Sequence, residues 1–174
     1  MAALVNVDGD VDRWAACGPE QTGYQADLHK WGNRMGIDTR AEPWAIIALW
    51  GDSAPSTKND SVNLLSFQVL SGTVKKRIWI CTFNKSSVCK CGCQGRHTFD
   101  DVFSVVAWSV RALISGLYPK HDHLGNEFPK GSYRRRMAGK SLGIHGTILR
   151  KFGDWAWFKQ SLGLMGLARG WRKG

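Results

Sequence analysis

The fold is decided by the stretch WAIIALWGDSAPSTKNDSVNLLSFQVLSGTVKKRIWICTFN, residues 44–84. Its opening nine residues, WAIIALWGD, form an apolar run that stops at Gly-Asp, as a buried strand does. Turn-forming residues at 53–60 and 71–72 separate this run from two further strand-like segments, at residues 61–70 and 75–84. Because both connections are short, the stretch predicts a three-stranded antiparallel meander.

The residues downstream of the meander predict a long helix and a fourth strand. Apolar side chains in residues 100–117 recur at helical spacing, and Thr98 with Asp101 resembles the start of a capping box. GIHGTILRKF, residues 143–152, reads as a strand that is again followed by Gly-Asp. We therefore predict an α/β (α+β) domain with a mixed sheet of about four to five strands and the long helix packed across it.

Weaker patterns complete the expected organisation of the chain. Three shorter helices are expected, at residues 25–35, 133–142 and 155–164. The expected segments are an irregular or helical N-terminal part at 1–42, a core at 43–164 with a Cys-rich insert at 86–98, and a basic tail at 165–174. One core domain with short flanking segments is the prediction.

Length and composition limit the class of protein. A chain of 174 residues with 43% apolar residues and nine Trp has the size and core-forming content of one domain and is not disordered. The longest apolar stretch, residues 102–118, is interrupted by Arg111 and is too short to span a membrane. The N-terminal residues show no signal or transit peptide. We expect a soluble protein inside the cell, in the nucleus, with reduced thiols.

Charge is distributed unevenly along the chain, whose net charge is +10. Residues 1–74 hold 5 Lys/Arg against 9 Asp/Glu, a balance of −4, whereas residues 75–174 hold 19 against 5, a balance of +14. Such an excess predicts a polyanionic partner, nucleic acid and DNA before RNA, and no membrane. The alternative is a charge that serves solubility or an intracellular membrane surface. The candidate phosphate contacts are Arg134, Arg135, Arg136, Lys140 and Lys151.

Two aspartates occupy matching positions, Asp52 after the first predicted strand and Asp154 after the fourth. If these strands are adjacent and parallel, both carboxylates emerge at the same end of the sheet. Such a pair can hold Mg²⁺ for phosphodiester chemistry by a two-metal mechanism. In the alternative interpretation both are turn or helix N-cap residues, since Gly-Asp between a strand and a helix is ordinary capping chemistry.

A cysteine-rich loop precedes the long helix. Four soft or borderline metal ligands fall within nine residues: Cys89, Cys91, Cys93 and His97. With reduced thiols this pattern indicates zinc. Because alternating cysteines are hard to wrap around one ion, we expect two of them to bind together with His97. The fourth ligand is then His121, His123 or a residue elsewhere in the chain. The alternatives are a reduced turn without metal and a solvated His-x-His pair.

Several segments together carry a resemblance to known proteins. LWGDSAP, LLSFQVLS, CKCGCQGRHTFDDVFSVVAWSVRAL, GLYPKHDHLG and FGDWAWFKQSLGL resemble a repeated group of dinoflagellate proteins that look like pieces of mobile elements. This resemblance covers roughly residues 44–164. Separately, the predicted strand order is similar to the ribonuclease H-like core of transposases and integrases, which implies Asp52 and Asp154 as the first two catalytic carboxylates. That superfamily normally places a third carboxylate on a later helix, and this sequence has no acidic residue after Asp154.

These observations lead to two expected functions. The first is a transposase- or nuclease-derived domain that binds nucleic acid and is a candidate for metal-dependent phosphodiester chemistry, with the activity of the chain alone left open. The second is a non-enzymatic, zinc-stabilised nucleic-acid-binding protein or ribonucleoprotein component. Dependence of nucleic-acid nicking on Asp52 and Asp154 separates the two.

Overall fold

The structure is a computed structural model that describes most of the chain. The described residues are 22–58, 60–71, 76–93, 95–153, 157–158 and 161. Asp154, the tail at residues 165–174 and most of the helix predicted at 155–164 lie outside them. None of the helices in this described part is both long and apolar enough to cross a membrane.

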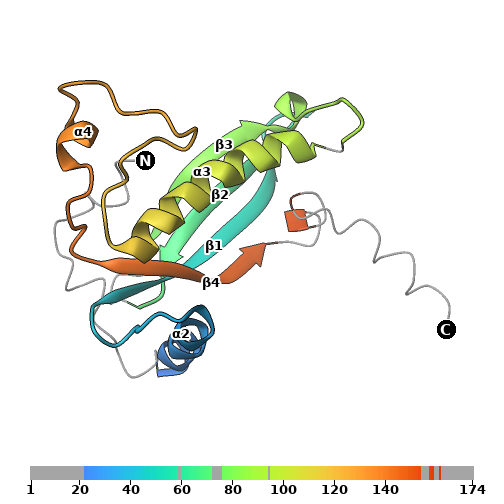
Figure 1. Cartoon of the computed structure of the whole chain (residues 1–174). Helices are drawn as coiled ribbons and strands as arrows, with labels where there is room; N and C mark the ends of the chain where they lie inside the picture. The colour runs from blue at the N-terminus through green and yellow to red at the C-terminus, as the bar shows by residue number, and fades with distance from the viewer. Residues whose placement is uncertain are drawn as a thin grey trace.

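A four-stranded mixed sheet forms the centre of the molecule (Figure 1). Its strands are β1 (Trp44–Pro55), β2 (Ser61–Val69), β3 (Arg77–Asn84) and β4 (His145–Gly153). The strand order is β3-β2-β1-β4, in which β1 pairs antiparallel with β2, β2 pairs antiparallel with β3, and β4 runs parallel to β1. The predicted meander and the mixed α/β class are therefore confirmed.

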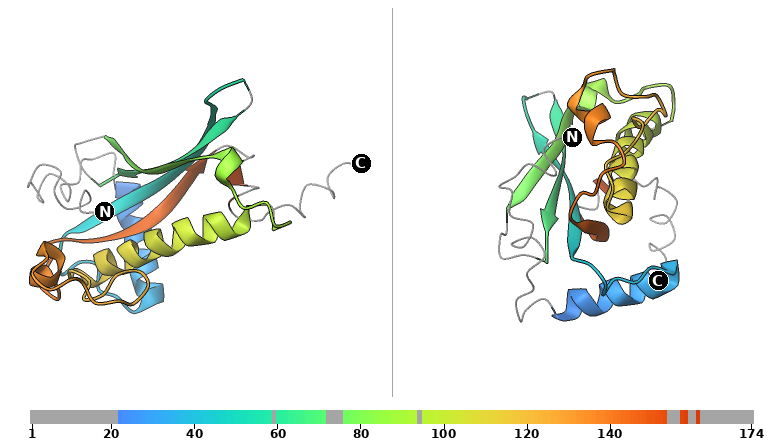
Figure 2. Two further views of the ribbon diagram at one scale, coloured as in Figure 1. Left: turned by 90° about the horizontal axis from the view of Figure 1, so that it is seen from above. Right: turned by 60° about the vertical axis from the view of Figure 1, so that its left-hand side comes forward.

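The long helix lies across one face of this sheet (Figures 1 and 2). It is α3 (Arg96–Ser115), and it begins four residues before the predicted start. The predicted capping box is wrong, because the N-cap is Gly95 at φ 87° and no side chain caps the helix. The Thr98 hydroxyl instead accepts a hydrogen bond from the backbone N–H of Cys89 at 3.0 Å. The helix therefore starts where the cysteine-rich loop turns, and it ends at Gly116, with φ 66°.

Three shorter helical elements flank the sheet. They are α2 (Thr22–Met35), the 3-10 turn η3 (Lys85–Ser87) and α4 (Tyr133–Met137). The basic helix α4 is shorter than the predicted 133–142, because its backbone leaves helical geometry at Ala138 and Gly139 follows at a positive φ of 76°. Its N-cap is Ser132, whose hydroxyl accepts from the backbone N–H of Arg135 at 3.2 Å.

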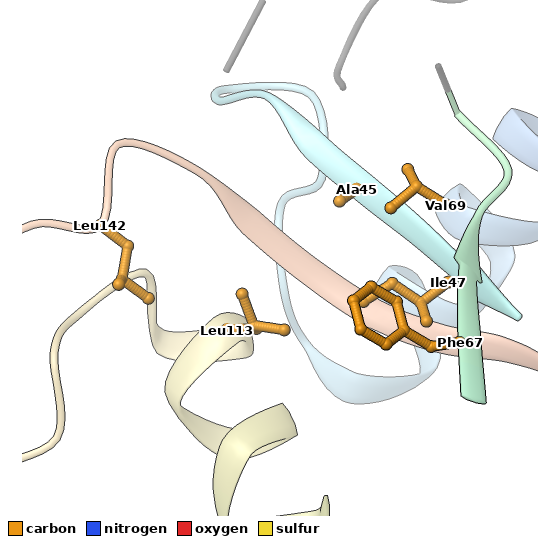
Figure 3. Packing of buried hydrophobic residues seen from close by; sticks show 6 residues of the cluster. All are labelled: Ala45, Ile47, Phe67, Val69, Leu113 and Leu142. Atoms are coloured by element: carbon orange, nitrogen blue, oxygen red, sulfur yellow. The ribbon is translucent and has the colours of Figure 1, made fainter. Parts of the chain in front are cut away.

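The core between α3 and the sheet follows from the two-residue alternation of β1. Alternate residues of β1 turn toward α3, so that Ala45 and Ile47 pack with Leu113 of α3 and with Phe67 of β2 (Figure 3). Leu49 continues this face and meets Val106 one to two turns earlier in the helix. An apolar cavity of about 100 Å³ remains under α3.

The helix α2 joins the sheet through a separate apolar cluster. Leu28 of α2 is fully buried and packs with Trp44 and Ile46 at the beginning of β1. An ion pair between Asp27 and Arg150 also connects α2 to β4. The described part of the N-terminal segment is thus helical and attached to the core.

Candidate metal centre

The cysteine-rich loop is folded back onto the first turn of α3 by local backbone geometry. After η3, Val88 is buried and fixes the start of the loop. Gly92 and Gly95 then adopt positive φ angles of 93° and 87°, which favour glycine. The hydrogen bond from the Cys89 N–H to Thr98 closes the loop against the helix. Residues near the two ends of the loop therefore meet.

This loop brings four metal-ligating side chains together. The ligand atoms of Cys89, Cys91, Cys93 and His97 all lie within 4.8 Å of one another. The sulfur atoms of Cys89 and Cys91 are 3.3 Å apart, and the His97 Nδ1 lies 3.6 Å and 3.4 Å from them, respectively. A tetrahedral ion with bonds of about 2.3 Å to sulfur and about 2.0 Å to nitrogen separates its ligands by roughly 3.5–3.8 Å. The cluster could thus hold a metal ion such as zinc.

The helix start also changes the acidity of the thiols. The backbone N–H of His97 donates to the Cys93 sulfur and lowers the pKa of this thiol to about 6. The hydrogen bond with Cys89 raises the pKa of the Cys91 thiol above its ordinary value. Thiolates are the metal-binding form of cysteine, so the N–H groups at the start of α3 favour ligation at Cys93.

The two other predicted ligands, His121 and His123, do not join this cluster of described residues. The carbonyl oxygen of His121 accepts a hydrogen bond from the indole N–H of Trp108 at 3.0 Å, which fixes this loop beside the middle of α3. Trp108 is about 16 Å from His97 along the helix axis, at 1.5 Å per residue. The cluster thus contains all three cysteines and His97, whereas the sequence predicted two cysteines, His97 and a more distant ligand.

Asp52 lies inside β1 and not after it as predicted, because β1 continues to Pro55, whereas β4 ends at Gly153, directly before Asp154. β1 and β4 are adjacent and parallel, with Gly51 opposite Gly153. Asp52 is exposed and accepts a hydrogen bond from the N–H of Ser53 at 2.8 Å. Asp154 lies outside the described residues. The structure therefore places β1 and β4 side by side, and of the two aspartates it describes only Asp52.

The matching glycines before the two aspartates have a packing explanation. A Cβ built on Gly51 would lie 1.9 Å from the Trp157 ring, and one on Gly153 would lie 3.2 Å from it. Trp157 is only 3% exposed and packs with Leu49. Gly51 therefore makes room for this indole, and a Cβ on Gly153 would also lie 2.6 Å from the Gly51 carbonyl oxygen, so both glycines have a packing role.

The basic residues of α4 are partly engaged in local contacts. The Arg135 guanidinium lies 2.5 Å from a carboxylate oxygen of Glu127 and lowers the pKa of that carboxyl. The Arg136 guanidinium donates to the carbonyl oxygen of Gly131 at 2.9 Å, and Arg134 lies 5.8 Å from the Phe128 ring. These contacts hold the loop before α4. The other two predicted phosphate contacts, Lys140 and Lys151, are exposed.

A second basic site was not predicted from the sequence. A cleft of about 480 Å³ between α2 and β4 is lined by Lys30, Arg34 and Arg150, together with Asp27 and Asn33. Lys30 and Arg34 are four residues apart, a spacing that places both side chains on one face of a helix. This pair of cations could have been recognised in the sequence. Arg150 is far away in the sequence, so only the tertiary structure adds it to the group.

Comparisons with known proteins add no family to these observations. The chain matches no protein-family model, no curated protein and no solved structure. The resemblances to the dinoflagellate group and to the ribonuclease H-like core remain predictions. The proposed function therefore rests on the chemistry of the chain's own residues.

Proposed function

We propose that this protein is a nucleic-acid-binding protein whose structure is stabilised by one zinc ion. The observation that carries the proposal is the convergence of Cys89, Cys91, Cys93 and His97 within 4.8 Å. Three thiolates and one imidazole favour zinc over hard ions such as Mg²⁺. Four protein ligands fill a tetrahedral site and leave no position for a substrate, so the ion has a structural role.

The place of the cluster explains why an ion is needed there. It connects the chain that leaves β3 to the first turn of α3. In described residues 85–95 the only buried apolar side chain is Val88, which buries too little surface to order a loop of this length. Zinc binding supplies the missing free energy because ligands are brought together only in the folded chain.

The charge distribution supports nucleic acid as the partner. Residues 75–174 hold 19 Lys/Arg against 5 Asp/Glu, and neutralising phosphates releases counterions from the polyanion. Binding of this kind weakens steeply with salt. The expected partner is DNA or RNA in the cell nucleus, and the zinc site orders the fold that presents the basic surface.

The test combines metal analysis with binding. Protein purified without chelator should contain about one zinc per chain, and Cys91→Ser with Cys93→Ser should lose it. Binding to a labelled oligonucleotide should fall steeply as salt increases. Absence of zinc in the purified protein would overturn the metal assignment, and absence of oligonucleotide binding at low salt would overturn the assigned partner.

A second candidate function is metal-dependent phosphodiester cleavage in a ribonuclease H-like domain, with Asp52 and Asp154 as Mg²⁺ ligands. The observation that favours it is the strand order β3-β2-β1-β4 with β4 parallel to β1, which is the arrangement this resemblance implies. Nicking of DNA in Mg²⁺ or Mn²⁺ that disappears in both Asp52→Asn and Asp154→Asn would establish it. Binding without cleavage would leave the zinc-stabilised binding protein.

A further inference from the structure

The sheet face turned away from α3 carries a row of aromatic side chains across its strands. Trp79 of β3 pairs with Ser66 of β2, Ser66 pairs with Trp50 of β1, and Trp50 pairs with Phe152 of β4. Residues in register share one face of a sheet, and Trp50 lies opposite to Leu49, which packs toward α3. With strands about 4.8 Å apart, this row is about 14 Å long.

Trp79 is the one strongly exposed ring of this aromatic row, whereas Trp50 and Phe152 are half-buried and Ser66 between the two tryptophans is buried. The Trp50 and Phe152 rings are stacked with centroids 4.5 Å apart and planes at 30°. The Arg77 guanidinium lies 3.8 Å above the Trp50 ring. Trp79 is 67% exposed, although a ring of this size on a sheet would normally be covered by packing. Trp79 thus offers an open aromatic surface at the end of the row.

The neighbouring row across the sheet, called the basic row here, has an arginine at each end and the fully buried Ala48 between them. Arg77 of β3 pairs with Gln68 of β2, Gln68 pairs with Ala48, and Ala48 pairs with Arg150 of β4. At Arg150 this row meets the cleft between α2 and β4, where Lys30 and Arg34 are exposed.

The two rows and the cleft together define a basic and aromatic surface. Its charged residues are Lys30, Arg34, Arg77 and Arg150 against Asp27, which pairs with Arg150. Four cations against one anion attract a polyanion. Asp52 lies one row beyond the aromatic row, in register with Leu64. The surface is therefore bounded by a negative charge on its far side.

We propose that this surface binds single-stranded nucleic acid, a proposal that rests on the nucleic-acid partner inferred above. A base stacks on Trp79, and phosphates lie near Arg77 and in the cleft beside α2. Stacking on Trp79 selects a single strand, because the bases of a duplex are already stacked on one another and cannot reach a protein ring. Stacking is tolerant of sequence, since every base has a flat aromatic face.

This surface differs from the one that the basic run at α4 predicts. On α4, Arg135 is paired with Glu127 and Arg136 donates to a backbone carbonyl. In the cleft, the side chains of Lys30 and Arg34 are exposed, and Arg150 lies 5.7 Å from the Tyr24 ring. The sheet surface adds the exposed ring of Trp79 to these cations, and cations with rings are the combination that binds single strands.

The first experiment measures binding of the full chain to labelled 15-nucleotide oligothymidine and oligouridine and to a duplex of the same length, by fluorescence anisotropy. Single strands should bind more tightly than the duplex. Trp79→Ala should weaken single-strand binding about ten-fold, whereas Trp79→Phe keeps a stacking ring and should stay close to the parent. Leu124→Ala is the matched control, because Leu124 is 73% exposed on the loop after α3.

The second experiment tests the basic cleft. Lys30→Ala with Arg34→Ala should weaken single-strand binding and reduce the slope of log K against log salt by about 1.4, at roughly 0.7 per lost phosphate contact. The control is Arg111→Ala with Lys120→Ala, two exposed cations on α3 and the loop after it. Circular dichroism and melting temperature show that each variant remains folded.

The outcomes separate this surface from the general function. If the parent binds no oligonucleotide, the proposed function is wrong. If the parent binds but the Trp79 and cleft variants bind equally well, or if the loss falls on Arg134→Ala with Arg136→Ala, the binding surface is elsewhere and this inference is overturned. A preference for the duplex would also overturn it. Comparison of oligothymidine with oligouridine shows whether DNA or RNA is the better ligand.

Discussion

The two ends of α3 are held by different chemistry. At the C-terminal end, Leu113 is buried among Ile47 and Leu142, and the His145 Nδ1 lies 3.0 Å from the carbonyl oxygen of Ile114. At the N-terminal end, cysteine sulfur atoms and the His97 ring surround the first turn. Phe99 in this first turn is also buried, against Phe83, so the N-terminal end combines apolar packing with the proposed metal ligands. The N-terminal end of α3 should therefore be the part of the core that depends on metal.

The largest effect should come from losing the metal. Chelation, or Cys91→Ser with Cys93→Ser, should lower the melting temperature by about 10 °C or more, because zinc binding contributes folding free energy. Hydrogen exchange should show the opening at residues 89–99 and not near Leu113. Asp52→Asn is the control and should melt like the parent. A double cysteine variant as stable as the parent would show that the loop needs no ion.

The apolar end should respond to Leu113→Ala. This substitution should cost about 3 kcal/mol, since it enlarges the cavity of about 100 Å³ under α3. Urea unfolding at fixed zinc concentration measures the change. The loss should be the same within about 0.5 kcal/mol in the double cysteine variant, because the two sites are far apart and share no partner. A strong coupling between them would show that the two ends are not independent.

The helix terminus at Gly116 should show a smaller effect. Gly116→Ala places a Cβ 2.5 Å from the His145 ring at a φ of 66°, and should cost roughly 2 kcal/mol. Gly125→Ala in the loop after α3 is the matched variant, since Gly125 has a φ of 87° and nothing lies within 4 Å of the added carbon. Thermal unfolding of both variants isolates the His145 contact. Equal losses would mean that backbone strain alone matters at Gly116.

The smallest effect should come from Asp60, which connects the β1–β2 loop to η3 near the metal loop. Its carboxylate accepts from the Ser86 hydroxyl at 2.5 Å and from two backbone N–H groups, and these bonds lower its pKa, the Ser86 hydroxyl most. A carboxylate with a lowered folded pKa stabilises the fold above its unfolded pKa of about 3.9 and loses this effect as the pH falls through the folded value.

Asp60→Asn should therefore lower the melting temperature by about 1–2 °C at pH 7, and this difference should be smaller at pH 3. Melting curves at both pH values measure the difference. The surface salt-bridge partner Asp100 offers a control, because Asp100→Asn removes an exposed charge pair with Arg96 at 3.6 Å. If the difference in melting temperature between Asp60→Asn and the parent increased toward acidic pH, this result would contradict the assigned hydrogen bonds.

The sequence by itself determined the elements of the core. The apolar run at the start of β1, the turn residues at 56–60 and the helical stripe between 100 and 115 are local patterns that produced the expected elements, although β1 continues through Pro55 into the predicted turn. The four candidate ligands Cys89, Cys91, Cys93 and His97 were also identifiable, because they lie within nine residues. Patterns of this kind depend only on residues that are close in the sequence, so they can be recognised without the structure.

Only the tertiary structure decided how these elements are joined. It starts α3 at Arg96, because the Thr98 hydroxyl is bonded to the Cys89 N–H, and it keeps His121 at a different point along the helix. It also aligns Trp79, Trp50 and Phe152 in one row, and adds Arg150 to the cations of α2. Strand register, β-bulges and helix docking arise from contacts between distant segments, and local periodicity does not encode which distant residues meet.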